Sequence, residues 1–427
     1  MIRTGPRVVP VVLASLIFLG GCALSPLRQS TPDIAVPASV PDIAVPEAPL
    51  PAVILPAAAV PEESPGPGEV PADTTPPGEP QAEAAAPPLR LTFAGDLMAH
   101  EVNVSMDDFS LIYRDIEAII QNDDFSFINM ETPVCAERPY RTYPAFNVQP
   151  PYADAAVNAG FEVFSLANNH TNDQGRAGIQ GSYSYFSQKP GVWAAGIREK
   201  AGDSISWQML QKNGWRILFA AVTELLNSPS NQERIDYYPP PRREALIAAI
   251  KALRAEHPAD IFVLSVHSAE EEYVRTVSRS RREFYAALIN AGVDVVWANH
   301  IHAAREWEIL GPPDTITGVI FYSCGNTISG QRTRYNFDNP ASDRDYTGEG
   351  FLFSVDFSRT PSGGWEILRV SPTLITTYRD RKDRYVIRRL DGAFIEELRR
   401  SGSAGEAAYF EKRKTLMGAI QGKRILP

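Results

Sequence analysis

Five short apolar runs of this chain are each followed closely by polar side chains of a kind that can bind metals. The runs span residues 89–94, 125–130, 162–167, 260–266 and 293–298. Apolar runs of this length that alternate with helical patterns indicate buried parallel strands in an α/β domain. Helices are expected over 107–122, 152–159, 176–187, 242–256 and 279–291, and Asn213-Gly214 predicts a hairpin within 202–222. We therefore expect a mixed α/β domain with some antiparallel strands.

The polar residues after these runs are predicted to meet in space, because ligands of open α/β sheets bind outside the carboxyl ends of the strands. Two carboxylates, two amides and four imidazoles would converge there: Asp96, Glu131, Asn168, Asn169, His170, His267, His300 and His302. This set suits a divalent metal site. It offers nitrogen and oxygen donors and no obvious thiolate, which favours Mn, Fe, Co or Zn in a catalytic site over a Cys-rich structural zinc site.

Individual residues of this set have different expected roles. His170, if it is not a ligand, can act as a general acid or base, and Asp173 is well placed to orient it. His300 and His302 stand two apart, so on extended backbone they would point to the same side. His257, before a proline, is expected to be a loop histidine, and the role of His100 stays open.

Residues 1–22 resemble a bacterial export signal that ends in a lipobox. Arg3 and Arg7 precede the short apolar core 8–19, and Leu19-Gly20-Gly21-Cys22 gives the cleavage pattern, with lipid on the Cys22 thiol. The alternative is a transmembrane anchor, but the core is well short of the ~20 residues that a spanning helix needs. Ala23 after the cysteine favours the outer membrane in a cell with two membranes, by resemblance to lipoprotein sorting rules.

Residues 23–88 have the composition of a disordered linker. They contain 17 of the 36 prolines, no aromatic residue, and nine acidic residues against one basic. Such a segment cannot bury enough surface to fold and behaves as an extended spacer. It also accounts for most of the net charge of −10, so the charge says little about partners, and nothing suggests nucleic acid binding.

The remaining chain divides into a folded domain over 89–377 and a basic extension over 378–427. The extension has 13 Lys or Arg against 7 Asp or Glu, and Ile387, Leu390, Phe394 and Leu398 stand at helical spacing. A helix docked on the core with a charged outer face is the favoured interpretation, and a polyanion-binding helix is the alternative. Cys135 and Cys324 could pair in an exported protein, although two separate thiols are favoured.

The motifs, taken together, resemble the capsule-synthesis (poly-γ-glutamate, CapA-like) family of the calcineurin-like metallophosphoesterase fold. The matching segments are 95–98, 129–133, 167–175, 265–267 with Glu271, 300–302 and 322–326, and the resemblance covers about 89–375. It implies a four-layer α/β/β/α sandwich with two divalent metal ions. The implied ligands are Asp96, Glu131, Asn169, His267, His300 and His302, with His170 beside the leaving group. The chain departs from the family pattern at Ala298, Ser268-Ala269 and Cys324.

Two functions are compatible with these observations. The first is an exported, lipid-anchored metallohydrolase of the cell envelope, in which metal-activated water attacks a phosphoester or an amide. By resemblance, it would act in the synthesis, release or anchoring of an anionic polymer such as poly-γ-glutamate, with the polymer-synthesis machinery as a partner. The second is a non-catalytic envelope protein of the same fold that binds polymer or partner enzymes.

Overall fold

The computed structural model describes residues 53–54, 87–202, 204–312, 316 and 318–425. The predicted signal 1–22, with Cys22, lies outside the described residues, as does the predicted linker 23–88 apart from residues 53–54 and 87–88. Within the described part of the chain, no helix combines the length and the apolar character needed to cross a membrane.

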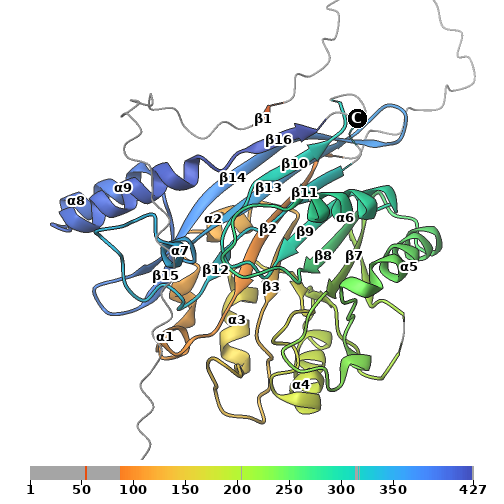
Figure 1. Ribbon diagram of the computed structural model, residues 1–427, viewed down its shortest axis with the longest axis horizontal. Helices are drawn as coiled ribbons and strands as arrows, with labels where there is room; N and C mark the ends of the chain where they lie inside the picture. The colour runs from red at the N-terminus through yellow and green to blue at the C-terminus, as the bar shows by residue number, and fades with distance from the viewer. Residues whose placement is uncertain (1–52, 55–86, 203, 313–315, 317, 426–427) are drawn as a thin grey trace, which may run out of the picture. The chain divides into compact units, whose positions relative to one another are not determined.

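Among the described residues, the first sheet has nine strands (Figure 1). Its parallel part is β2-β3-β4-β5, and β13 and β14 continue it with antiparallel pairing on the other side of β2. β12 pairs with the end of β2, β15 pairs with β14, and β1 lies at the β14 edge. The strands are Val53–Ile54 (β1), Leu89–Leu97 (β2), Phe125–Met130 (β3), Val163–Ser165 (β4), Trp193–Ala195 (β5), Asn326–Ile328 (β12), Glu349–Arg359 (β13), Trp365–Arg379 (β14) and Tyr385–Arg389 (β15).

The second sheet has seven strands in the described part of the chain, in the order β16-β10-β11-β9-β8-β7-β6. β7, β8, β9 and β11 are parallel neighbours, and β6 and β7 form the hairpin predicted at Asn213-Gly214. The strands are Trp207–Lys212 (β6), Trp215–Thr223 (β7), Ile261–His267 (β8), Val295–Asn299 (β9), Trp307–Leu310 (β10), Gly318–Phe321 (β11) and Gly422–Ile425 (β16).

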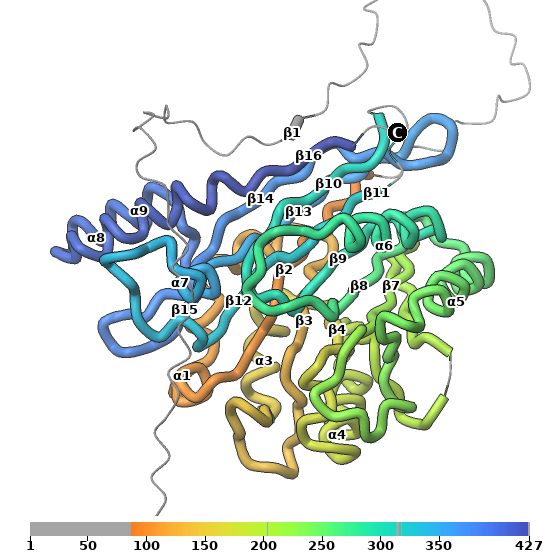
Figure 2. Tube along the Cα trace, in the orientation of Figure 1, coloured from red at the N-terminus to blue at the C-terminus, as the bar shows by residue number. Residues whose placement is uncertain are grey.

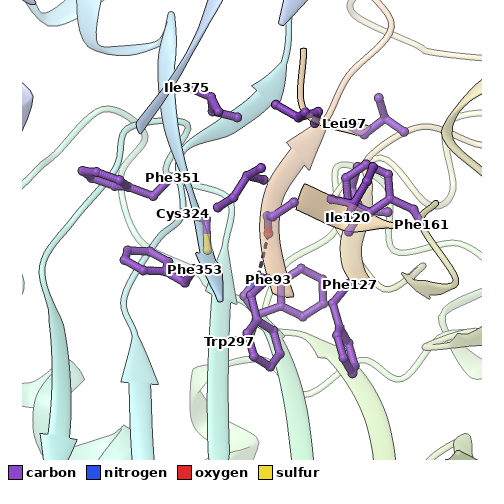
Figure 3. Packing of buried hydrophobic residues seen from close by; sticks show 14 of the residues in the cluster. Phe93, Leu97, Ile120, Phe127, Phe161, Trp297, Cys324, Phe351, Phe353 and Ile375 are labelled. Atoms are coloured by element: carbon purple, nitrogen blue, oxygen red, sulfur yellow. Dashed lines mark hydrogen bonds between the residues drawn. The ribbon is translucent and has the colours of Figure 1, made fainter. Parts of the chain in front are cut away.

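The two sheets face each other across an aromatic core (Figure 3). Phe127 of the first sheet contacts Phe219 and Trp297 of the second, with ring centroids 5.6 Å and 6.1 Å apart. The Trp297 indole Nε1 donates a hydrogen bond to the Ala94 carbonyl, 2.8 Å away. The buried indole N–H is thereby satisfied by the opposite sheet, which fixes how the two sheets face each other at this point.

Helices cover the outer faces of both sheets and complete four layers, as Figure 1 shows. Strand β8 explains why the apolar runs are continuous. Ile261 and Val263 enter the core between the sheets, whereas Leu264 and Val266 pack under α5 and α6 on the outside. On the other sheet, Phe164 of β4 packs against Phe186 of α4. Both faces of these strands are buried, so both sets of alternate positions are apolar. The four-layer α/β/β/α sandwich is thus confirmed.

The helices agree with four of the five expected segments. Their bounds are Glu101–Val104 (α1), Glu117–Ile120 (α2), Pro150–Ala159 (α3), Gly175–Ser187 (α4), Arg243–Glu256 (α5), Arg279–Asn290 (α6), Asp343–Tyr346 (α7), Gly392–Arg400 (α8) and Ala404–Gly418 (α9), with 3-10 turns at Phe109–Ile112 (η1), Gln232–Arg234 (η2) and Pro240–Arg242 (η3). The single helix expected over 107–122 is wrong. Asp108 accepts hydrogen bonds from the backbone and hydroxyl of Ser110, which favours a short turn over a continuous helix.

The C-terminal extension is more mixed than the sequence suggested. It begins inside β14, continues with β15, and ends with β16 after helices α8 and α9. Ile387 is therefore a strand residue, whereas Phe394 and Leu398 are buried on α8. Phe394 contacts Tyr378 of β14, so α8 docks on the core (Figure 2). Helical spacing alone could not reveal that Ile387 pairs with Thr377.

Candidate metal centre

Four strands bring polar side chains to one place between the two sheets, and Figure 2 traces their path. Asp96 lies near the end of β2, Glu131 follows β3, His267 ends β8 and His300 follows β9. Ligand atoms of Asp96, Glu131 and His267 lie within 4.8 Å of one another, as do those of Glu131, His300 and His302. Glu131 belongs to both groups, so it lies where a bridging ligand would be.

One half of the cluster is built around His302. Its Nδ1 lies 3.1 Å from Asp96 Oδ2 and 3.0 Å from Asn326 Oδ1. Its Nε2 lies 3.6 Å from Glu131 Oε1. Asn326 begins β12, which pairs with the end of β2, so the strand pairing itself brings Asn326 beside Asp96.

The other half is built around His267. Its Nε2 lies 2.9 Å from Asn169 Oδ1 and 3.7 Å from Glu131 Oε1. The imidazole of His300 packs against it, with ring centroids 4.9 Å apart. The structure thus brings all six predicted ligands together, while their role as ligands stays a prediction.

His300 and His302 reach the cluster by a backbone geometry that differs from the predicted one. Extended backbone was expected to turn both side chains to the same side, but β9 ends at Asn299 and both histidines have positive φ, 100° and 58°. That explanation is therefore wrong. Non-glycine residues at positive φ are uncommon, and such strain persists where the surroundings hold it, often at functional sites.

Several buried atoms of this cluster have no hydrogen-bond partner among the described residues. They are Glu131 Oε1, Asn129 Oδ1 and His300 Nδ1. A buried polar atom without a partner costs about 1–3 kcal/mol. Glu131 Oε1 also lies within 4 Å of two imidazoles. An acceptor of this kind, next to further lone-pair donors, fits a divalent cation.

The pKa shifts of the cluster also favour a bound cation. Burial, and then the neighbouring Asp96 carboxylate, raise the pKa of Glu131 well above its ordinary value. Burial lowers the pKa of His267 well below its usual range, and burial with the neighbouring His302 lowers the pKa of His300 to about 4. Burial would also lower the pKa of His302, but the Asp96 carboxylate outweighs it and the pKa is raised. A bound cation would stabilise both carboxylates and use the lone pairs of neutral imidazoles.

His170 and Asp173 form a separate buried pair at the side of the cluster. His170 Nδ1 lies 2.6 Å from Asp173 Oδ2, which also accepts a hydrogen bond from the Phe146 backbone N–H. Asn227 Nδ2 lies 3.3 Å from the same ring nitrogen. The predicted partnership of His170 with Asp173 is therefore seen in the contacts, and it leaves the Nε2 of His170 as the ring atom available to a substrate.

A cavity of about 450 Å³ opens beside these residues. Its wall includes His170 and His302, so it reaches both the proposed acid–base residue and the metal cluster. The remaining lining residues are Met98, His100, Tyr143, Glu272, Tyr273, Gly330, Gln331, Arg344 and Thr347. A small substrate group in this cavity would contact the cluster and His170 at once.

Sequence reasoning missed several polar residues of this site. Asn129 Nδ2 donates to Asp96 Oδ1 at 2.8 Å and to Glu131 Oε2 at 3.3 Å. Its position inside the matched Asn-Met-Glu segment was the only available signal. His100, whose role was open, lines the cavity and accepts a hydrogen bond from the Gly330 backbone N–H. Burial, followed by the nearby His302 and His170, lowers the pKa of His100 to about 4.

Cys135, Cys324 and His257 are not among the residues that form the metal cluster. Cys135 and Cys324 are both buried and free, so they are not paired. Burial raises the pKa of the Cys324 thiol, which argues against a thiolate ligand there. His257 follows α5 as its C-cap residue, and its ring packs on Trp207, with centroids 3.9 Å apart.

Residues 90–331 match the bacterial capsule synthesis protein PGA_cap family. The chain belongs to this family. The matched segment contains every residue of the metal cluster described above, and it ends before α7 and the C-terminal extension. The predicted CapA-like membership is confirmed.

Two curated proteins of Bacillus are similar to the chain over part of their lengths. The capsule biosynthesis protein CapA of Bacillus anthracis is 26% identical over 263 residues, which is 57% of this chain and 60% of that protein. The PGA biosynthesis protein CapA of Bacillus subtilis (strain 168) is 27% identical over 259 residues, 58% of this chain and 65% of that protein. The chain therefore matches less than two thirds of either relative.

Solved structures give a more distant likeness. A hypothetical protein from Thermus thermophilus aligns over 67% of this PGA_cap chain and 98% of its own, with a TM-score of 0.42 and 15% identity. A putative 5'-nucleotidase from Staphylococcus aureus aligns over 70% of this chain and 57% of its own, with a TM-score of 0.41 and 12% identity.

Proposed function

We propose that this protein is an exported, lipid-anchored, metal-dependent hydrolase of the bacterial cell envelope. It would act in the synthesis, release or anchoring of a capsule polymer of the poly-γ-glutamate type. Family membership supports the link to capsule synthesis. The buried cluster around Glu131 carries the hydrolase part, because two carboxylates, an amide and three imidazoles share one site with unpartnered acceptor atoms.

The proposal includes two divalent ions, one on each side of Glu131. The ions would be held by the two groups that the ligand atoms form, His300 with His302 in one and Asp96, His267 and the adjacent Asn169 in the other, with Glu131 belonging to both. Glu131 is the residue common to both groups, and its Oε1 lies 3.7 Å from His267 Nε2 and 3.6 Å from His302 Nε2, which supports a shared role. When bound, the ions supply Lewis acidity and activate water for attack on a phosphoester or an amide.

The residues of the chain have distinct parts in such a reaction. His170 faces the cavity with Nδ1 engaged by Asp173, so Nε2 is the atom that would pass a proton to or from the leaving group. Asp173 holds the ring in place, and its own carboxylate is held by the Phe146 N–H. Because the side chains of the cluster are buried, each of these contacts is electrostatically stronger than it would be in water.

The envelope location rests on the sequence of the N-terminal segment. Cys22 would carry the lipid, residues 23–88 would act as a spacer, and the outer membrane is favoured where a cell has two membranes. Replacing Cys22 by serine should abolish lipid labelling and release the protein from membranes. Unchanged labelling and fractionation of Cys22→Ser would contradict the anchor.

The enzymatic part is tested with the purified full-length protein. Its metal content is measured first, and hydrolysis of phosphodiesters and of γ-glutamyl polymer is then measured side by side. Hydrolysis that stops when a chelator removes the metal, and returns when a divalent metal salt is added back, supports the proposal. A protein that takes up no divalent metal under any loading condition contradicts it, and the function then reverts to a non-catalytic protein that binds polymer or partner enzymes.

A further inference from the structure

A second hollow, of about 600 Å³, lies on the C-terminal part of the fold. It is formed by the segment around η1, the β14–β15 hairpin and helix α8, and it shares no lining residue with the cavity at the metal cluster. Leu111, Val386 and Leu398 give it an apolar component. Most of it comes from residues beyond 331, where the family match ends.

The charged lining of this hollow, which we call the basic groove, is unbalanced. Five cationic side chains line it against three carboxylates: Arg114, Arg381, Lys382, Arg384 and Arg388 against Asp115, Asp380 and Glu397. The groove therefore carries an excess of positive charge. A concave surface lined by an excess of one sign of charge attracts ligands of the opposite sign, so an acidic ligand is favoured here.

Internal ion pairs account for only part of the positive charge. Arg384 pairs with Asp380 at 2.5 Å, and Arg388 pairs with Glu397 at 2.6 Å and Asp115 at 3.2 Å. All three groove carboxylates are thereby occupied.

Three cations of the groove have no carboxylate within ion-pair distance among the described residues. The side chains of Arg114 and Lys382 form no ion pair there, and Arg381 donates only to the backbone carbonyl of Ser401. All three side chains are exposed. They come from different parts of the groove, since Arg114 follows η1 whereas Arg381 and Lys382 form the tip of the hairpin. A ligand that engages all three must therefore extend along the groove.

We propose that the basic groove binds an extended polycarboxylate chain as a site separate from the metal cluster. The carboxylates of such a chain would contact the unpaired cations, and its methylene groups would contact the apolar side chains of Leu111, Val386 and Leu398. This inference deepens the proposed function, because the ligand belongs to the polymer class named there. The groove would hold polymer on the protein while one segment of it reaches the catalytic cavity.

The test measures binding of poly-γ-glutamate to the full-length protein, with no hydrolysis required. A triple variant, Arg114→Gln with Arg381→Gln and Lys382→Gln, removes the unpaired cations and leaves every groove ion pair intact. We expect it to weaken polymer binding about tenfold, given three exposed charge contacts. The matched control is Lys200→Gln with Lys251→Gln and Lys414→Gln, three exposed cations outside the groove that likewise form no ion pair among the described residues.

The control and two further measurements decide the outcome. Equal loss of binding in both triple variants would show that net charge alone attracts the polymer, and would overturn the proposal, as would a native protein that binds no polymer. The third measurement is binding to anionic phosphatidylglycerol vesicles. If the groove variant loses vesicle binding but binds polymer as the native protein does, the groove is a membrane-binding surface, and the proposal is overturned. His302→Ala should keep polymer binding, so failure of the metal proposal is seen separately from failure of the groove.

Discussion

Two buried clusters of charged side chains in this protein differ in how their charges are balanced. In the metal cluster, the described residues at ion-pair distance from Asp96 and Glu131 are histidines, and Glu131 Oε1 has no hydrogen-bond partner among the described residues. In the second cluster, at the base of α9, Arg332 and Arg413 enclose Glu349, and Arg413 Nε donates to Glu349 Oε2 at 2.9 Å. The carboxylate of the second cluster is paired with guanidinium groups of the protein, whereas Glu131 in the first lies among imidazoles, in a group that could hold a cation from outside.

The second cluster also supports the cavity. Arg332 bonds the Thr376 hydroxyl at 2.7 Å, and Tyr409 of α9 bonds Asp345. Gln331, Arg344 and Thr347 of the cavity wall lie next to residues of this network in the chain. The Arg332–Arg413–Glu349 cluster therefore helps to position the cavity wall beside the metal cluster. Since it has a structural role, burial of charged side chains alone does not identify a functional site.

The largest expected effect separates two histidines of the site. His302→Ala should lose metal and activity together, because a ligand gap in a buried site is not easily filled. His170→Ala should keep near-normal metal and lose about 10²- to 10⁴-fold in turnover, as a proton-transfer residue does. Elemental analysis and single-turnover rates measure the two effects, with His257→Ala as the control. Equal loss of metal in His170→Ala would make His170 a ligand.

Breaking the balanced cluster should affect folding and not metal chemistry. Arg413→Met removes one partner of the fully buried Glu349. We expect a loss of about 3–5 kcal/mol in the free energy of unfolding, because the carboxylate is left buried without full compensation. Urea unfolding measures it, and Lys412→Met, at an exposed neighbour on the same helix, is the control. A change below about 1 kcal/mol would mean that solvent reaches Glu349 in Arg413→Met.

A third carboxylate tests whether a raised pKa by itself marks a site. Burial raises the pKa of Glu162 to about 7, and its carboxylate accepts a backbone hydrogen bond from Ser126. The folded protein keeps this proton up to about pH 7, whereas the unfolded chain releases it near its ordinary value. The free energy of unfolding therefore falls as pH rises between those two values.

Glu162→Gln should remove this dependence. At pH 8 the variant should be more stable than the native protein by about 2 kcal/mol, and at pH 4 the two should be equal. Urea transitions at both pH values measure the difference, and metal content should not change. A variant that is less stable at pH 8 would show that the Glu162 carboxylate is ionised in the folded protein and stabilised there.

The smallest expected effect concerns Glu131 itself. Glu131→Gln removes a buried acid whose pKa is raised by burial and by Asp96. Without added metal, the variant should be more stable than the native protein by on the order of 1 kcal/mol at neutral pH. With metal, the order should reverse, since only the native protein gains binding energy. Thermal unfolding with and without a divalent ion checks this, and a variant that is destabilised in both conditions would contradict the account.

The sequence predicted those parts of the fold and site that depend on local pattern. The strand that ends at His267 is apolar at nearly every position before the histidine because both its faces are buried, so its run was visible. Asn326 and Asn129 were not proposed as site residues, because their place beside Asp96 depends on strand pairing between distant segments. The positive φ of His300 and His302 is set by the surrounding structure and leaves no pattern in the residue types.

The most direct test of the central claim is the metal content of the native full-length protein compared with Glu131→Ala. The account predicts about two divalent ions per chain in the native protein, since Glu131 lies between two ligand groups. It predicts loss of both ions in the variant, because the shared ligand is gone. A native protein that binds no divalent ion, or a Glu131→Ala variant that retains two, would contradict it.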